Sequence, residues 1–333
     1  GDLDIYAGAY INYTSPATLS YFENIGTPTS PAFAAPQNES FGPGGGYFYA
    51  APALVDIDGD GDLDKFAFTA YGQVYYFENT GSGTMPAFAP YTTAPFGIGT
   101  TADDAVPAFV DLDGDGDQDL LLGVIASFNA TFHYYENTGS SNSPAFAAPA
   151  TNPFSISGVP GYAGPPAPAF ADFDIDGDWD LMYGERYGGF YYEENVGSAA
   201  SPAFGNATFN PFSLSSIGTQ LSTPALADLD GDGSIDLLSG RIDGSFSFYK
   251  GTSIGTSVNL DRHAFKYQAV VRDSMGALIT DQAISLRVSI LNGAGGAAVC
   301  RETHSATTNS FGLVNLNMGC LLYTSDAADD QAS

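Results

Sequence analysis

Four acidic segments of nine residues carry the clearest chemistry in this 333-residue chain. They begin at Asp56 (DIDGDGDLD), Asp111 (DLDGDGDQD), Asp172 (DFDIDGDWD) and Asp228 (DLDGDGSID). Each has Asp at positions 1, 3, 5 and 9 and Gly at position 6. Carboxylates crowded into so short a loop repel one another unless a cation lies between them. Oxygen ligands without His or Cys argue against zinc and copper, and the flexible coordination of Ca²⁺ favours it over magnesium.

The spacing resembles the first nine positions of an EF-hand loop. In that geometry the side chains at positions 1, 3 and 5 converge on the ion, and Gly at position 6 permits the bend. Position 7 offers its carbonyl and position 9 closes the site. One alternative is a solvated acidic turn, against which four copies in register argue. Another is a helix–loop–helix or dockerin-like module, but DLLLGV or DLLSGR and a glycine turn follow instead of an amphipathic helix.

Each acidic segment belongs to a longer repeat, and successive copies lie 55, 61 and 56 residues apart. A Pro-Ala-apolar stretch precedes each copy, and aromatic stretches ending in Glu-Asn at 23–24, 78–79, 136–137 and 194–195 are followed by Pro-Ala-Phe. Short apolar runs such as 119–124 and 130–137 predict strands rather than helices. Three or four antiparallel strands per unit cannot bury both faces alone, so neighbouring units must stack. The sequence therefore predicts an all-β fold made of β-propeller blades, with four to five blades visible.

These features together resemble FG-GAP/VCBS-type repeats, the calcium-binding blades of integrin-α-like propellers, over residues 1–250. The resemblance implies Ca²⁺ as the cofactor, at about four complete sites and one partial site. The implied ligands are Asp4 as the last residue of a partial loop, then Asp56, Asp58, Asp60, Asp62 and Asp64; Asp111, Asp113, Asp115, Asp117 and Asp119; Asp172, Asp174, Asp176, Asp178 and Asp180; and Asp228, Asp230, Asp232, Ser234 and Asp236.

Composition narrows the class of partner. Hydrophobic residues make up 44% of the chain, which is enough for a core. With 9 basic and 38 acidic residues the net charge is −29, which disfavours a nucleic-acid partner. No apolar run is long enough to predict a transmembrane segment. Gly (40 residues) and Pro (20) suit short strands joined by turns.

The C-terminal part differs in composition. Residues 251–262 are expected to form a linker, and residues 263–319 a partial Ig-like β domain with strands near 265–272, 283–291, 297–305 and 312–318. This segment resembles a domain of large bacterial surface proteins exported by type IX secretion.

The sequence also gives an expectation for each end of the chain. The chain is expected to begin inside a motif, because residues 1–4 repeat residues 61–64. Residues 320–333 include CLLYTSDAADD, which resembles a translated sequencing adapter, so we expect them to contribute nothing to the fold.

No familiar catalytic motif is present, so no enzyme is predicted. His133 is expected to be a packing residue of an aromatic strand. The glutamates that recur with the repeat are expected to be structural: Glu23, Glu78, Glu136 and Glu194. Glu185 and Arg186 are interpreted as a solvated pair or a weak site candidate. The expected function is an extracellular or cell-surface adhesion module for a glycan or protein, with tyrosines such as Tyr75, Tyr134 and Tyr191 either stacking on ligand or filling the core. The alternatives are a polysaccharide-lyase-like enzyme and a purely structural spacer.

Overall fold

The computed structural model describes residues 3–9, 17–27, 29–41, 50–83, 85–99, 101, 104–126, 129–158, 164–218, 221–241, 244–251, 265–270, 282–291, 298–307 and 313–318. The chain divides into two compact units, Gly1–Ser253 and Ile254–Ser333. Within the described residues, no helix is long and apolar enough to cross a membrane.

The first unit is an arrangement of five propeller blades, each an antiparallel sheet. Blade 1 contains β1 (Ile5–Ala9), β2 (Ala17–Phe22) and β3 (Gln37–Phe41). Blade 2 contains β4 (Ala50–Val55), β5 (Asp64–Thr69), β6 (Val74–Phe77) and β7 (Thr92–Thr93). Blade 3 contains β8 (Val106–Val110), β9 (Asp119–Ala126), β10 (Asn129–Tyr135) and β11 (Ala150–Thr151). Blade 4 contains β12 (Ala167–Ala171), β13 (Asp180–Gly184), β14 (Phe190–Glu193) and β15 (Thr208–Phe209). Blade 5 contains β16 (Thr223–Ala227), β17 (Asp236–Gly240) and β18 (Phe246–Tyr249).

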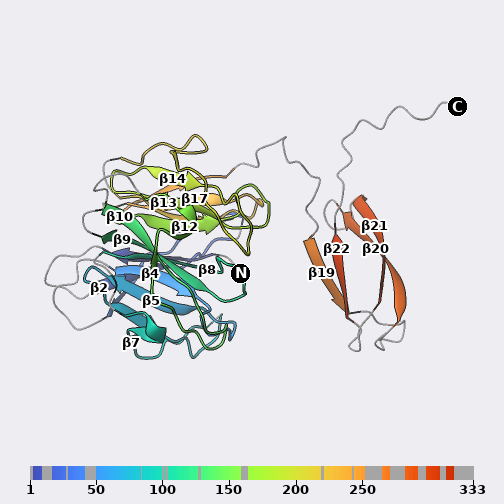
Figure 1. Cartoon of the computed structure of the whole chain (residues 1–333), viewed down its shortest axis with the longest axis horizontal. Coiled ribbons are helices and arrows are strands. Elements are labelled where there is room, and N and C mark those ends of the chain that lie inside the picture. The colour runs from blue at the N-terminus through green and yellow to red at the C-terminus, as the bar shows by residue number, and fades with distance from the viewer. Residues whose placement is uncertain are drawn as a thin grey trace. The chain divides into compact units, whose positions relative to one another are not determined.

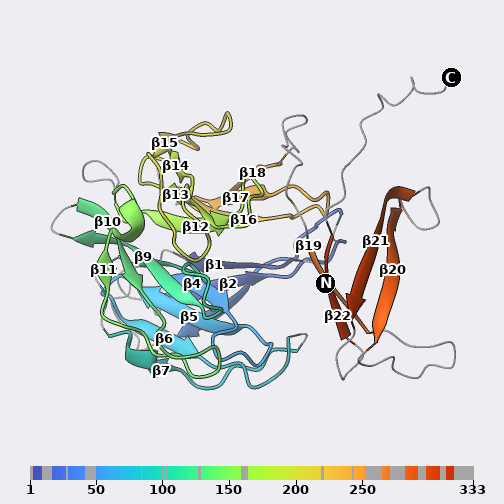
Figure 2. The ribbon, with the colours of Figure 1, turned by 45° about the vertical axis from the view of Figure 1, so that its right-hand side comes forward.

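The first strand of a complete blade lies toward the middle of the unit. β4 contacts β8, β8 contacts β12, and β12 contacts β16. Figure 1 shows β4, β8 and β12 near the centre, and Figure 2 shows β7, β11 and β15 at the periphery. Short 3₁₀ turns, η1 (Pro95–Gly97) and η2 (Pro153–Ser155), follow β7 and β11. The all-β prediction of propeller blades is confirmed.

The core lies between blades, because both faces of each sheet are covered. Leu120 and Leu122 of β9 pack with Phe66 and Phe68 of blade 2, while Leu121 packs with Leu181 and Tyr183 of blade 4. This explains why β9 is apolar at consecutive positions rather than at alternate ones. Blades 1 and 5 also contact each other, since the rings of Phe22 and Phe246 meet edge to face at 5.6 Å between centroids.

The second unit contains β19 (Phe265–Val270), β20 (Ala283–Leu291), β21 (Ala298–Thr307) and β22 (Leu313–Met318). β19 pairs with β22 and β20 with β21, both antiparallel, and β21 contacts β22. The predicted strands thus lie close to their expected bounds, while the Ig-like assignment stays a prediction. The proposed adapter segment 320–333 falls outside the described residues.

Candidate metal sites

The four acidic segments form the hairpin loops between the first and second strands of blades 2–5. In blade 3 the strand residues Val110 and Asp119 pair across the hairpin, so positions 1–8 form the loop and position 9 begins the next strand. The pairs Val55–Asp64, Ala171–Asp180 and Ala227–Asp236 repeat this register.

Three carboxylates converge in each loop. In blades 2–4 these are positions 1, 3 and 5, and one carboxylate oxygen from each lies within 4.8 Å of the others. In blade 5 the converging set is instead positions 1, 3 and 9. The groups are Asp56, Asp58 and Asp60; Asp111, Asp113 and Asp115; Asp172, Asp174 and Asp176; and Asp228, Asp230 and Asp236.

Backbone geometry holds these carboxylates together. Gly at position 6 has a φ of 87° to 97° in all four loops, and its N–H donates to the position-1 carboxylate at 2.9–3.1 Å. Position 4 is also left-handed, at Gly in three loops and at Ile175 (φ 64°) in blade 4. A β-branched residue is unusual in that region, so the loop of blade 4 is strained at Ile175.

One buried oxygen in each loop has no hydrogen-bond partner. These atoms are Oδ1 of Asp56, Asp111, Asp178 and Asp230. A buried acceptor left unpaired is costly, and a bound cation would satisfy it. The donors are all carboxylates, which is the chemistry that Ca²⁺ prefers. The residues therefore fit a calcium ion.

Position 9 lies outside the converging set in blades 2–4 and holds the blade together. Asp119 accepts hydrogen bonds from the Asn137 N–H (2.8 Å), the Tyr134 hydroxyl (2.7 Å) and the Leu112 N–H (3.2 Å). Asp64 and Asp180 bind the matching Asn and Tyr of their blades, and Asp4 binds Asn24 and Tyr21 in blade 1. This role of the tyrosine is not among the expectations from sequence, although the recurring Tyr-x-Glu-Asn pattern carries its signal.

Burial and mutual repulsion raise the pKa values of several loop carboxyls. Burial is the largest cause for Asp64, Asp119 and Asp180, each with a pKa raised to about 6. For Asp113, burial and then the Asp115 carboxylate raise the pKa. At position 7, Asp178 is buried and its pKa is raised to about 6, first by burial and then by Asp176. Its counterparts Asp62, Asp117 and Ser234 are partly exposed.

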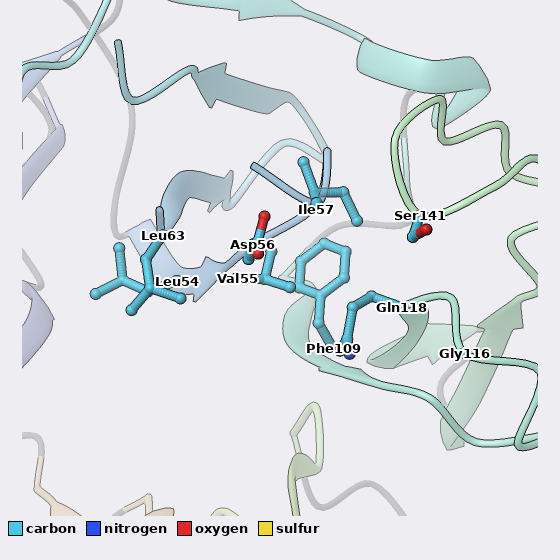
Figure 3. A pocket seen from close by; sticks show the side chains of 10 residues that line it. Leu54, Val55, Asp56, Ile57, Leu63, Phe109, Gly116, Gln118 and Ser141 are labelled. Atoms are coloured by element: carbon cyan, nitrogen blue, oxygen red, sulfur yellow. The ribbon is translucent and has the colours of Figure 1, made fainter. Parts of the chain in front are cut away.

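A hollow of about 430 Å³ lies between the loops of blades 2 and 3 (Figure 3). Leu54, Leu63, Phe109 and Gln118 line it, beside Asp56. Leu63 and Gln118 occupy position 8 of their loops. Gln118 of blade 3 is the polar exception. In the other four blades the position-8 side chain is apolar and exposed, with exposed fractions of 46% for Leu3, 51% for Leu63, 42% for Trp179 and 39% for Ile235.

Glu185 and His133, which were considered as site candidates, lie in strands and turns of the blades. Glu185 is buried, so the predicted solvated pair with Arg186 is wrong. Its carboxylate accepts the N–H groups of Tyr187 (2.7 Å) and Gly189 (2.8 Å), which closes the turn between β13 and β14. His133 is half-buried in β10, and burial lowers its pKa.

The recurring aromatic side chains mostly fill the core. Tyr75, Tyr76, Tyr134 and Tyr135 are buried, while Tyr191 and Tyr192 are partly buried. The packing alternative thus accounts for most of them. The side chains of Glu23, Glu78, Glu136 and Glu194 are exposed at the ends of these strands.

Comparison with known proteins places a family match on this region. Residues 56–122 match the model of an FG-GAP-like repeat. No curated protein matches the chain. Among solved structures, a Tc holotoxin pore from Photorhabdus luminescens is similar with 16% identity and a TM-score of 0.33, over 71% of this chain and 14% of that one. The repeat match and the blade arrangement support an FG-GAP propeller.

Proposed function

We propose that the five-bladed unit is a calcium-stabilised extracellular module that binds a glycan or a protein and catalyses no reaction. The observation that carries the proposal is the repeated convergence of three carboxylates in loops that each hold a buried carboxylate oxygen without a hydrogen-bond partner. In blades 2–4, positions 1, 3 and 5 would hold the ion. Bound calcium would offset the repulsion within each loop and fix the hairpin between the first two strands of the blade.

The ligand surface that this proposal favours is the set of position-8 side chains at the ends of the loops. Leu63, Trp179 and Ile235 are each more than one-third exposed next to an acidic loop. Apolar and aromatic groups exposed next to polar groups are typical of binding surfaces. An ordered, calcium-loaded loop would hold each of these side chains in a fixed place.

The burial of the recurring tyrosines favours the second candidate, a structural spacer in a larger surface protein. Those tyrosines offer little free ring surface for stacking on a sugar. The Ig-like character of the second unit and the extracellular location remain part of the proposal, and they rest on the family resemblances.

Calcium titration of the full chain in a calorimeter tests the metal part of the proposal. Extracellular calcium modules bind at about 10⁻⁴–10⁻³ M, and we expect saturable binding in that range. Absence of binding at several millimolar calcium would contradict it.

A glycan and protein array, probed in calcium and in chelator, tests the binding part. We expect calcium-dependent capture that Trp179→Ala weakens, and no release of reducing or unsaturated ends from polysaccharides. Capture of nothing would favour the spacer, and steady product release would show an enzyme.

A further inference from the structure

The loop of blade 5 differs from the other three in carrying a basic residue. Lys250 follows β18 at the place where the other blades have Glu23, Glu78, Glu136 and Glu194. Position 7 of this loop is Ser234 where the other loops have Asp. Blade 5 therefore has four loop aspartates and a lysine, whereas each complete loop of blades 2–4 has five aspartates and a glutamate beside it.

The backbone puts Lys250 in the same place as those glutamates. Tyr249 pairs with Leu237 in blade 5, as Tyr135 pairs with Leu120 in blade 3. In both blades the residue two positions after this tyrosine donates its N–H to the position-9 carboxylate. Gly251 donates to Asp236 (2.7 Å), and Asn137 donates to Asp119 (2.8 Å). Lys250 and Glu136 are thus equivalent positions with opposite charge.

The ammonium group of Lys250 lies on the acidic loop. Its Nζ donates to Oδ2 of Asp230, at position 3, and lies 3.0 Å from Oδ2 of Asp232, at position 5. Asp232 is the residue that the converging set of blade 5 lacks, because Asp236 replaces it there. In blades 2–4 the position-5 carboxylate belongs to the set.

We propose that Lys250 serves as a built-in cation for the blade 5 loop, so that among the four complete loops of the described residues those of blades 2–4 bind calcium with ordinary affinity and that of blade 5 much more weakly. This inference rests on the calcium-binding function proposed above. An ion entering the blade 5 loop must displace or approach the ammonium, which already occupies carboxylate oxygens at positions 3 and 5. The blade 5 loop is thereby held in place without metal.

A reciprocal charge swap tests this inference by calorimetric calcium titration of the full chain. We expect three sites in the parent, with any fourth weaker by roughly tenfold or more. Lys250→Glu, which restores the residue of the other blades, should give four comparable sites. Glu136→Lys should reduce three sites to two. Both substitutions lie at exposed positions after a strand, so we expect both variants to fold.

Four equal sites in the parent would overturn the inference while leaving the calcium-binding proposal intact, and so would three sites in both the parent and Lys250→Glu. No binding by any of the proteins would overturn both. A second measurement does not use calcium: in chelator, Lys250→Met should lower the melting temperature, because the loop loses its internal cation. An unchanged melting temperature in chelator would also count against the built-in cation.

Discussion

At the scale of single residues, the acidic loops contain two kinds of aspartate. In blades 2–4, those at positions 1, 3 and 5 face one another, and those at position 9 accept hydrogen bonds from a tyrosine and from the backbone. The first kind repel one another without a cation, whereas the second kind stabilise the blade whether or not a cation is present. The position-9 carboxylate is therefore more than the closing ligand expected from sequence.

This division predicts opposite calcium dependence for two substitutions in blade 3. Asp119→Ala should cost on the order of 3 kcal/mol of unfolding free energy even in chelator, because three donors lose their acceptor. Asp113→Ala should cost little in chelator, since it relieves repulsion and loses only one long, exposed hydrogen bond from the Asp115 N–H (3.3 Å). At about 1 mM calcium it should cost about 1.4 kcal/mol, the contribution of one site of about 10⁻⁴ M affinity. Urea unfolding with and without calcium measures both, and equal losses for Asp113→Ala in the two conditions would contradict its role as a ligand.

Glu193 predicts a pH dependence separate from the loops. It is fully buried in β14, where it accepts hydrogen bonds from the Ser157 N–H (2.9 Å) and the Tyr183 hydroxyl (3.0 Å). Burial raises its pKa from 4.5 to about 7. Because the folded pKa lies above the unfolded one, the folded state loses stability as pH rises from about 4.5 to 7, and the loss levels off above that.

Glu193→Gln should remove this slope, so its stability relative to the parent should improve between about pH 5 and pH 7.5, by an amount on the order of 2 kcal/mol. Urea unfolding at the two pH values measures it. Taking the difference between variant and parent cancels the titration of the loop aspartates. A constant difference across this range would show that Glu193 is ionised throughout.

At the scale of elements, three blades come close to the next blade at a glycine four residues after the position-9 aspartate. A Cβ on Gly123 would lie 1.6 Å from the carbonyl oxygen of Pro166, which precedes the first strand of the next blade. Gly8 and Gly184 meet Ala50 and Ser222 in the same way, at 1.7 and 2.1 Å. At these three positions the absence of a side chain lets the backbone of the next blade come close, whereas blade 2 has Phe68 at the equivalent position.

Gly123→Ala should therefore force blades 3 and 4 apart and cost about 3 kcal/mol or more of unfolding free energy. Gly99→Ala is the matched control, because a Cβ there meets nothing within 4 Å. Denaturant unfolding compares the two variants, and equal stability would mean that the blades can separate at no cost.

The elements that could be predicted from the sequence are those that repeat. The loops, the strands and the propeller blades were predictable, because the same residue types recur at the same places in each unit. Residues that break the repeat were not. Lys65 stands where the later blades have Leu120, Leu181 and Leu237, and its buried side chain pairs with Glu39 of blade 1 at 2.6 Å. Such a contact joins residues far apart in sequence, and only the fold brings them together.

At the scale of the whole molecule, negative charge lowers the free energy of unfolding and bound calcium would raise it. The chain carries a net charge of −29, and the complete loops concentrate much of it in small volumes. General salt screens repulsion between exposed charges over about 8 Å at physiological ionic strength, whereas converging carboxylates are closer than that. Calcium bound in the loops therefore gives a stabilisation that salt alone cannot replace.

Chelation should lower the melting temperature of the five-bladed unit substantially. Three sites of about 10⁻⁴ M affinity contribute about 4 kcal/mol at millimolar calcium, which corresponds to a shift of roughly 10 °C for a unit of this size. Calorimetric melts in calcium, in chelator, and in chelator with about 0.5 M sodium chloride separate the two effects. We expect salt to restore only a small part of the loss, and magnesium to restore less than calcium because it demands a stricter octahedral geometry. Full recovery in sodium chloride would mean that the loops respond to screening alone and hold no specific ion.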